Sequence, residues 1–342
     1  MADVEGGNRA QGRLPRVLFL ATGGTISMRI DAESGGAVPR LSGAELLALV
    51  PGVEKVADVE VREFGRYPGP HMTVERMWEL RAAVLDAQRE GFDGVVVTHG
   101  TDTIEETAYL LDRSIPADIP VVITGAMRNS SELSWDGPAN FMAATEVAAS
   151  SESRGRGTMV VMDESVVQGS EVVKTHTEEA GTFRSPNWGP LGVTDNGRVL
   201  FYRESRRKPA LTPDEPQRLV DLVKMVAGAD SRLVDASLDS GAQGLVIEAM
   251  GRGNVPPAVV PGIQRWIDAG RPVLIASRSH RGRVLDTYAY DGGGHQLREM
   301  GAIFADVLTG PQARLELMLA LGVFGTDLLG IRAVVEGDRY DV

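Results

Sequence analysis

The chain has 342 residues, of which 43% are apolar and 24% are charged, a composition typical of a globular protein with a sizeable core. Its 47 acidic and 35 basic residues give a net charge of −12, which disfavours nucleic acids and anionic membranes as partners because both require a basic surface. The absence of cysteine excludes disulfides, thiolate catalysis and cysteine metal ligands.

The N-terminal residues 1–14 are polar and contain glycine, which predicts a flexible tail. This segment has neither the basic stretch nor the apolar core of a signal peptide. No apolar run approaches the roughly 20 residues that span a bilayer. We therefore expect a soluble, cytoplasmic protein that has no membrane partner.

Short apolar runs alternate with longer helical patterns along the first half of the chain. Strands are expected at residues 17–20, 95–97, 120–123 and 159–162, and helices at residues 73–90, 103–111 and 140–149. Thr103 and Glu106 have the spacing of a helix capping box. The alternation predicts a mostly parallel sheet covered on both faces, as in Rossmann-like and flavodoxin-like α/β domains.

A charged, proline-containing stretch then interrupts this rhythm and predicts an interdomain linker at residues 205–218. The alternation resumes after it. Strands are expected at residues 222–226, 244–247 and 272–275, and a final amphipathic helix at residues 311–321. The sequence therefore predicts two α/β domains: a larger N-terminal one at residues 15–204 and a smaller parallel one at residues 219–342.

Two of the expected strands lead directly into polar loops that contain glycine, at residues 22–25 and 98–102. Ligands bind at the carboxyl ends of the strands in open parallel sheets, and glycine lets the backbone approach a ligand closely. Any one of these threonines alone would more simply serve a turn or a helix cap. The two loops together favour a site of hydroxyl groups, an acid and free N–H groups.

Other patterns in the chain argue against alternative chemistries. The histidines form no H-E-x-x-H motif and no pair flanked by carboxylates, so no metal site is expected, and His99 is expected to be structural. No G-x-S-x-G elbow is present, which disfavours a serine hydrolase of that type. Residues 251–254 contain two glycines but no Walker lysine, which is weak evidence for a nucleotide.

The two polar loops resemble the signature segments of the bacterial-type asparaginase/glutaminase family. The matching stretches are residues 21–26 and 94–108, with further matches at residues 124–128, 136–140, 173–175, 189–192, 251–254 and 311–314. The resemblance follows the order of the family from about residue 16 to about residue 325, so it covers both expected domains.

The resemblance implies a role for four residues. Thr25 matches the threonine nucleophile, and Asp102 matches the acid that binds the α-ammonium group of the substrate. Thr101 and Lys174 match the second threonine and the lysine that assist proton transfer. The substrate-binding positions that it implies are Gly24, Gly69, Pro70, Thr101, Asp102 and Ala126. It implies no cofactor and no metal.

These roles are chemically consistent. A threonine hydroxyl becomes a nucleophile when a neighbouring base takes its proton, and a lysine serves as that base only when part of it is neutral. The Gly23–Gly24 turn and the Gly125–Ala126 loop offer N–H groups for a tetrahedral intermediate. An acyl-enzyme on Thr25 and direct attack by water both remain open.

Three features depart from the family pattern. The loop at residues 28–41 has no tyrosine, and Ala37 falls near the place where many members carry one. Glycines at 35 and 36 are consistent with a flexible lid, and Tyr67 is a candidate substitute from another segment. Gly69 and Pro70 stand where better-known members have a polar pair such as Ser-Gln for the substrate carboxylate.

Residues near Gly69 and Pro70, and others in the second half of the chain, are further candidates for substrate binding. Arg66 and His71 are candidates to bind an anion. In the family, residues of a neighbouring subunit complete each site. The candidates here are Arg252, where an asparagine is common, and Asp286, Tyr288 and Tyr290, in a stretch where a glutamate is expected.

The sequence therefore predicts an L-asparagine amidohydrolase that releases aspartate and ammonia and assembles as a homodimer or homotetramer. The alternatives are a glutaminase or other short-amide hydrolase, and a catalytically weak, amino-acid-binding regulatory protein. The amidase subunit of a tRNA-dependent amidotransferase is a further relative. We would expect that subunit to carry an extra N-terminal domain, whereas about 15 residues precede the first strand here.

Overall fold

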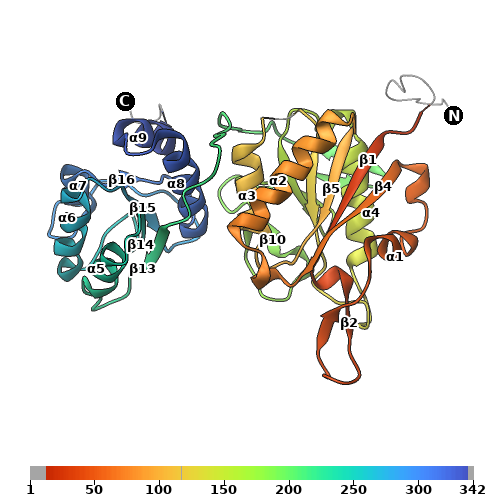
Figure 1. Ribbon diagram of the computed structural model, residues 1–342, viewed down its shortest axis with the longest axis horizontal. Coiled ribbons are helices and arrows are strands. Elements are labelled where there is room, and N and C mark those ends of the chain that lie inside the picture. Colours follow the sequence, from red (N-terminus) through yellow and green to blue (C-terminus); the bar gives the residue numbers. More distant parts are fainter. Residues whose placement is uncertain (1–12, 117, 338–342) are drawn as a thin grey trace.

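The computed structural model describes residues 13–116 and 118–337. The predicted tail at residues 1–14 therefore lies almost entirely outside the described residues. Two separate sheets organise the chain, as the sequence predicted, a large one in the first half and a small one in the second (Figure 1).

The large sheet has eight strands in the order β12-β11-β8-β7-β6-β5-β1-β4. Five of them pair in parallel: β4 (Asp58–Tyr67), β1 (Arg16–Gly23), β5 (Gly94–Thr98), β6 (Val121–Thr124) and β7 (Thr158–Met162). The other three extend the sheet in antiparallel fashion: β8 (Ser165–Gln168), β11 (Gly192–Asp195) and β12 (Arg198–Phe201). The expectation of a mostly parallel sheet is confirmed.

Alternate residues of β1 pack against different helices, because successive side chains of a strand point to opposite faces of the sheet. Leu18 and Leu20 join the apolar cluster under α2 (Val74–Arg89) and α3 (Ile104–Ser114). Val17 and Phe19 join the cluster under α1 (Gly43–Ala48) and α4 (Gly137–Ala149). The sheet is therefore buried on both faces, as its near-continuous apolar strands predicted.

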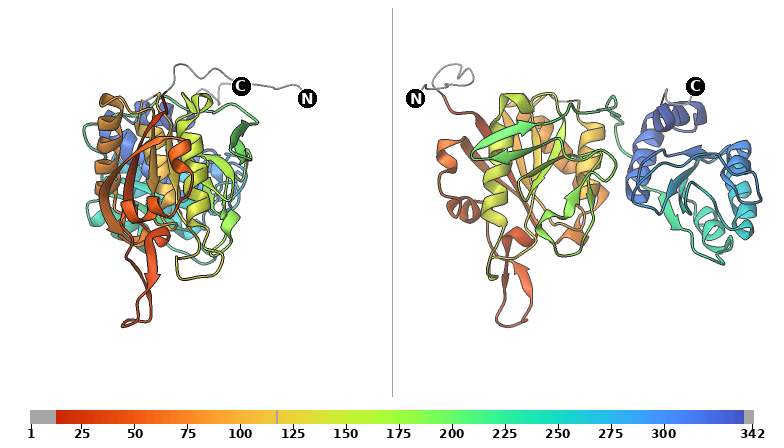
Figure 2. Two further views of the ribbon diagram at one scale, coloured as in Figure 1. Left: turned by 90° about the vertical axis from the view of Figure 1, so that its right-hand side faces the viewer. Right: turned by 180° about the vertical axis from the view of Figure 1, so that it is seen from behind.

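The expected loop at residues 28–41 contains an antiparallel hairpin, formed by β2 (Met28–Ile30) and β3 (Ala37–Pro39). The hairpin projects from the body of the larger domain (Figures 1 and 2). A second short ribbon consists of β9 (Val173–Lys174) and β10 (Phe183–Arg184). It belongs to neither main sheet.

The prediction of a capping box at the start of α3 is wrong. Thr103 is the N-cap residue of α3, but its side chain makes no capping hydrogen bond. The Thr103 hydroxyl instead donates to the carbonyl oxygen of Gly69, at 2.9 Å. The Thr103 side chain thus joins two loops and does not cap the helix.

The small sheet is parallel throughout, in the order β13-β14-β15-β16. Its strands are β13 (Val220–Lys224), β14 (Gly244–Ala249), β15 (Val273–Ser277) and β16 (Ile303–Phe304). One face carries α5 (Arg232–Asp239), α6 (Val260–Asp268) and α7 (Gly294–Met300), and the other carries α8 (Gly310–Phe324) and α9 (Leu328–Glu336). Helix α8 faces the larger domain (Figure 1).

Residues 202–219 join the two sheets without forming a helix or a strand. One apolar cluster runs from α3 across to α8, so the two halves share buried surface. The domain limits at residues 204 and 219 remain our proposal. Among the described residues, no helix is long and apolar enough to cross a bilayer.

Candidate active site

Three loops at the carboxyl end of the large sheet pack backbone against backbone. A Cβ atom on Gly24 would lie 2.5 Å from the backbone nitrogen of Gly100, and one on Gly100 would lie 2.5 Å from the Cα atom of Gly69. The N–H group of Gly24 also donates to the carbonyl oxygen of Tyr67, at 3.0 Å. Because only glycine permits such approach, these glycines bring the segments that follow β1, β5 and β4 together.

Thr25 follows the Gly23–Gly24 turn and opens a short 3₁₀ helix, Thr25–Ser27. Its side chain is half-buried, and within the described part of the chain its hydroxyl makes no hydrogen bond. Thr22 differs, because its buried hydroxyl donates to the carbonyl oxygen of Thr98 at 2.6 Å. Thr22 therefore holds β1 to β5, whereas the Thr25 hydroxyl has no such partner among the described residues.

Lys174 reaches from β9 to the loop after β5. Its Nζ atom donates to Oγ1 of Thr101 at 3.1 Å and to Oδ1 of Asp102 at 2.7 Å. The Lys174 side chain is only 16% exposed, whereas that of Asp102 is 59% exposed. Thr101, Asp102 and Lys174 are thus in direct contact, and Lys174 is not an ordinary solvated surface lysine.

Glu105 is a residue of this cluster to which the sequence analysis gave no role. Its Oε2 atom accepts a hydrogen bond from the backbone N–H of Lys174, at 2.7 Å. Burial raises the pKa of the Glu105 carboxyl to about 7, against the opposing effect of the Lys174 N–H group. The two adjacent glutamates, Glu105 and Glu106, in the matched segment were the only hint in the sequence of a role for Glu105. They do not indicate that it contacts Lys174.

His99 is structural, as predicted. Its ring is fully buried, and burial lowers its pKa to about 4, so the ring is neutral near pH 7. Nδ1 lies 2.9 Å from the Gly100 carbonyl oxygen, and Nε2 lies 2.9 Å from Oγ1 of Thr107. Since a carbonyl oxygen can only accept, Nδ1 carries the proton and Nε2 accepts from Thr107.

The loop after β6 is held by the start of α4. The Asp136 carboxylate accepts hydrogen bonds from the backbone N–H groups of Met127 and Arg128, at 3.0 and 2.9 Å. Nδ2 of Asn140 donates to the Gly125 carbonyl oxygen at 3.0 Å. The Ala126 side chain is buried in the apolar cluster under α4, so this residue has only its backbone to offer a substrate.

The structure places Gly69 directly against Asp102. A Cβ atom on Gly69 would lie 3.0 Å from that of Asp102. Pro70 follows in a short 3₁₀ helix, Gly69–His71, and has no N–H group to donate. Gly69 therefore lies beside the proposed α-ammonium site, whereas binding of the substrate carboxylate by this pair remains a prediction.

The Tyr67 ring lies under the guanidinium group of Arg76, whose carbon is 4.1 Å from the ring centroid. Arg76 also donates to the carbonyl oxygen of His71. These contacts hold the ring and the start of α2 together. A role for Tyr67 in place of the missing lid tyrosine, and for Arg66 or His71 in anion binding, remain predictions.

The β2–β3 hairpin is fastened to the loop before α4. The Met28 carbonyl oxygen accepts hydrogen bonds from the N–H and hydroxyl groups of Ser130, at 3.1 and 2.9 Å. The Ile30 N–H group donates to the Ser131 hydroxyl at 3.0 Å. Ala37 pairs with Ile30 in the hairpin, so the position that lacks tyrosine belongs to an ordered ribbon.

The residues proposed to complete a neighbouring site lie in loops of the smaller domain. Arg252 follows β14, and Asp286, Tyr288 and Tyr290 follow β15. The rings of Tyr288 and Tyr290 are exposed and their centroids lie 5.5 Å apart. Their role between subunits remains a prediction.

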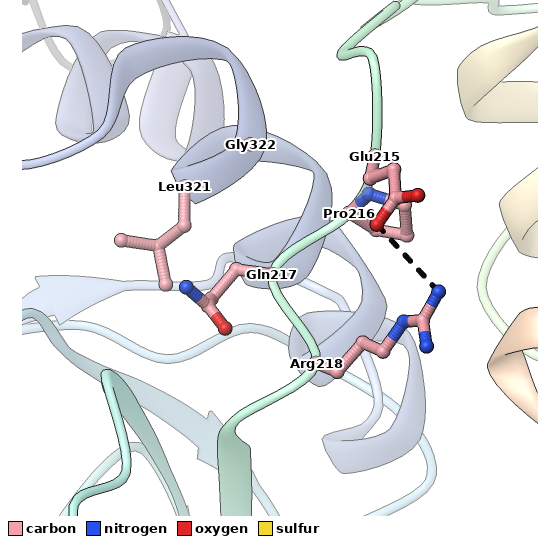
Figure 3. Close-up of a pocket in the computed structure, with 6 residues that line it drawn as sticks. All are labelled: Glu215, Pro216, Gln217, Arg218, Leu321 and Gly322. Carbon is pink, nitrogen blue, oxygen red and sulfur yellow. Dashed lines mark ion pairs between the residues drawn. The ribbon is translucent and has the colours of Figure 1, made fainter.

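A cavity of about 400 Å³ lies between the segment before β13 and helix α8 (Figure 3). It is lined by Glu215, Pro216, Gln217, Arg218, Leu321 and Gly322, and an ion pair joins Arg218 to Glu215 at 3.6 Å. None of the predicted catalytic residues lines it, so this cavity is not the candidate active site. Among residues 13–116 and 118–337, no three histidine or acidic side chains are grouped to hold a metal ion.

Comparison with known proteins agrees with this arrangement. The N-terminal asparaginase domain model matches residues 16–207, and the glutaminase/asparaginase C-terminal domain model matches residues 219–334. A probable L-asparaginase of Deinococcus radiodurans is 38% identical over 91% of this chain and 94% of its own length. L-asparaginase 2 of Escherichia coli is 34% identical over 90% of this chain and 89% of its own length.

A solved structure is similar over both domains. The crystal structure of a probable cytoplasmic L-asparaginase from Campylobacter jejuni has a TM-score of 0.83 and 30% sequence identity, and the match covers 94% of this chain and 99% of that one. The chain therefore belongs to the asparaginase/glutaminase family, as its threonine segments predicted. It is an enzyme of the amidohydrolase class.

Proposed function

We propose that the chain hydrolyses the side-chain amide of L-asparagine to aspartate and ammonia, with Thr25 as the nucleophile. The relatives from Deinococcus radiodurans, Bacillus licheniformis and Escherichia coli are all named as L-asparaginases, which supports this substrate. The observation that carries the proposal is the contact of Lys174 with both Thr101 and Asp102, in a loop whose Gly100 packs against Gly24, the residue before Thr25.

The proposal divides the reaction into two halves, of which the first forms an ester. The Thr25 oxygen attacks the amide carbon while its proton passes to the Thr101–Lys174 pair, with the Lys174 amine neutral at that moment. N–H groups of the Gly125–Ala126 loop stabilise the oxyanion, because the N–H group of Gly24 is engaged by the Tyr67 carbonyl oxygen. The amide nitrogen takes up the proton and leaves as ammonia, which leaves an aspartyl ester on Thr25.

In the second half, a water molecule attacks this ester, aspartate departs and the Thr25 hydroxyl regains a proton. Asp102 binds the α-ammonium group of the substrate through the carboxylate face that Lys174 leaves exposed. An alternative in which water attacks the amide directly gives the same products without the ester.

The experiment is an ammonia-release assay on Thr25→Ala and Thr25→Ser, with circular dichroism and thermal unfolding to check the fold. We expect Thr25→Ala to lose turnover and Thr25→Ser to keep part of it, because serine retains a hydroxyl. Rapid quenching and mass spectrometry would show the aspartyl ester. Appreciable turnover by Thr25→Ala would rule Thr25 out as the nucleophile.

Glutamine and other short amides are the second candidate substrates. Gly69 and Pro70 motivate this alternative, because they offer the substrate backbone few side-chain hydrogen-bond partners. One methylene group changes selectivity by only about 1–3 kcal/mol. Comparing kcat/KM for L-asparagine, D-asparagine and L-glutamine decides between them. Binding without ammonia release from any of the three would favour a regulatory amino-acid-binding protein.

A second group of relatives consists of glutamyl-tRNA(Gln) amidotransferase subunits D, of which that of Methanosarcina barkeri is 32% identical. The match covers 91% of this chain and 75% of that subunit. Ammonia release from a free amino acid, without any tRNA or second subunit, would separate our proposal from that function.

We also propose that the enzyme works without a cofactor, in the cytoplasm, as a homodimer or homotetramer. The named relatives include one described as cytoplasmic and one described as periplasmic. Cell fractionation tests the location, and light scattering after size-exclusion chromatography tests the assembly. Activity that survives dialysis against a chelator would support the absence of a metal requirement.

A further inference from the structure

Glu105 connects the strand that carries Lys174 to the helix that follows Thr101 and Asp102. It lies in the first turn of α3, and its Oε2 atom accepts the backbone N–H of Lys174 at 2.7 Å. Strand β9 has two residues and pairs only with the equally short β10. So short a ribbon forms few hydrogen bonds of its own, and the bond from Glu105 ties it to the buried helix α3.

Lys174 is consequently held at both ends. Glu105 holds its backbone, while Thr101 and Asp102 hold its Nζ atom at 3.1 and 2.7 Å. All three of these partners lie between residues 101 and 105, on one loop and the helix turn that follows it. A shift of β9 would therefore lengthen the contact between Nζ and Thr101 without moving Thr101 itself.

We infer that Glu105 is a positioning residue for amide hydrolysis: it fixes the backbone of Lys174 and thereby aims the amine at Thr101. The inference rests on the proposed function, since it assigns Lys174 its part in proton transfer. Glu105 makes no contact with Thr25, and its own proton takes no part in the reaction. A misplacement of catalytic groups by about 1 Å can cost about 100-fold in rate.

The surroundings of Glu105 also shift the pKa of its carboxyl. Burial raises the pKa of this carboxyl to about 7; the Lys174 N–H lowers it, the neighbouring Glu106 raises it, and the Lys174 charge lowers it. The other charged groups close by are Asp102, paired with Lys174, and Arg314 on α8, which acts on Glu106. Both the ionised and the protonated carboxyl have an oxygen that can accept the Lys174 N–H group.

The test compares Glu105→Ala and Glu105→Gln, with Glu106→Gln as the matched control. Glutamine keeps an oxygen that accepts the Lys174 N–H group but carries no charge. Glu106 is the next residue in the same turn, and among the described residues its side chain makes no hydrogen bond. Each variant is assayed for kcat and KM with L-asparagine from pH 5 to about pH 9, and its thermal unfolding is measured.

We expect Glu105→Ala to lose about 10- to 100-fold in kcat, with KM changed much less. Glu105→Gln should recover most of that loss, because the amide oxygen can still accept the Lys174 N–H group. Glu106→Gln should match the unaltered enzyme. The inference is overturned if Glu105→Ala keeps full kcat, or if Glu105→Gln, which conserves size, is no better than Glu105→Ala. If the alanine variant does not fold, the glutamine variant decides: a folded Glu105→Gln protein whose kcat falls by about 100-fold overturns the inference, because its amide oxygen still accepts the Lys174 N–H group.

Crystal structures of the same variants separate this inference from the proposed function. In Glu105→Ala we expect β9 to shift and the distance between Lys174 Nζ and Thr101 Oγ1 to exceed its present 3.1 Å. An unchanged distance overturns the inference even if the chain proves to hydrolyse no amide. Conversely, absence of ammonia release by the unaltered enzyme contradicts the proposed function and leaves this distance to decide the role of Glu105.

Discussion

The guanidinium group of Arg113 on α3 donates two hydrogen bonds, both 2.9 Å, to the carboxylate of Glu316 on α8. The two side chains are 3% and 0% exposed, so this ion pair is buried where the two halves of the chain meet. The hydroxyl of Tyr109 donates to the same carboxylate at 3.0 Å. Burial alone would raise the pKa of Glu316, but Arg113, Lys208 and Tyr109 hold it below its ordinary value.

Replacing Glu316 by alanine should destabilise the protein strongly, because it leaves Arg113 buried without its partner charge. Breaking one side of a buried pair typically costs about 3–5 kcal/mol. Asp230→Ala is the control, since it removes an exposed ion pair with Arg232, and exposed pairs contribute little to stability. Thermal unfolding of both variants measures the difference, and equal midpoints would contradict the prediction.

His99→Gln should make the protein less sensitive to acid. Burial lowers the pKa of His99 from 6.5 to about 4, so the fold favours the neutral ring. The associated stability is complete above pH 6.5 and is lost as the pH falls toward 4, in total about 3 kcal/mol. Urea unfolding between pH 7 and about pH 4 measures this loss.

The control for that experiment is His295→Gln, because the His295 side chain is half exposed beside Glu299. It should retain the pH dependence of the unaltered protein. A pH dependence of unfolding that is the same in all three proteins would show that His99 does not carry the acid sensitivity.

Gly24→Ala should abolish activity, whereas Gly35→Ala should not. Both glycines have positive φ, +83° and +66°, so both variants carry a backbone cost of about 1–3 kcal/mol, which is higher at Gly24 because its ψ of 178° lies in a region that essentially only glycine adopts. Only at Gly24 would the new Cβ atom collide with another chain segment, 2.5 Å from the backbone of His99 and Gly100. Ammonia release and melting temperatures check the pair; comparable loss of activity in both would contradict the steric explanation.

Gly69→Ala should weaken substrate binding more than it slows the chemical step. The added Cβ would lie 3.0 Å from Cβ and 3.2 Å from the backbone nitrogen of Asp102, tight enough to displace that residue. We expect KM for L-asparagine to rise about tenfold, equivalent to about 1.4 kcal/mol, with a smaller change in kcat. Gly36→Ala in the hairpin is the control, and a lower KM in Gly69→Ala would contradict the prediction.

Much of the fold was predictable because its central strands are continuously apolar. The predicted strand at residues 95–97 and helix at residues 73–90 correspond to β5 and α2 within a few residues. Strand β4 was missed because it is an edge strand whose exposed side chains are charged, such as Glu60 and Arg62. Its sequence lacks the apolar run by which the buried parallel strands were identified.

The candidate site was predictable to a similar extent. The loops at Thr25 and Thr101 follow recognisable strands, so the sequence locates them at one sheet edge. Lys174 lies on the two-residue strand β9, which is too short to be recognised from a periodic pattern in the sequence. Glu105 and Thr103 likewise form hydrogen bonds to residues distant in sequence, which the sequence does not reveal. The spacing of Thr103 and Glu106 suggested a local helix cap and not the contact of Thr103 with Gly69.

Helix α3 carries Glu105 in its first turn and Arg113 in its last, so one rod of 11 residues, about 16 Å long, has one end at Lys174 and the other at Glu316. Because α3 is a rigid helix, a tilt at its Arg113 end also moves its Glu105 end. If the contact between Arg113 and Glu316 weakens, the hydrogen bond from Glu105 to Lys174 should weaken as well. This should happen before either sheet unfolds. On heating, activity would decline ahead of the loss of secondary structure, and the amide protons at the start of α3 would exchange together with those at its end.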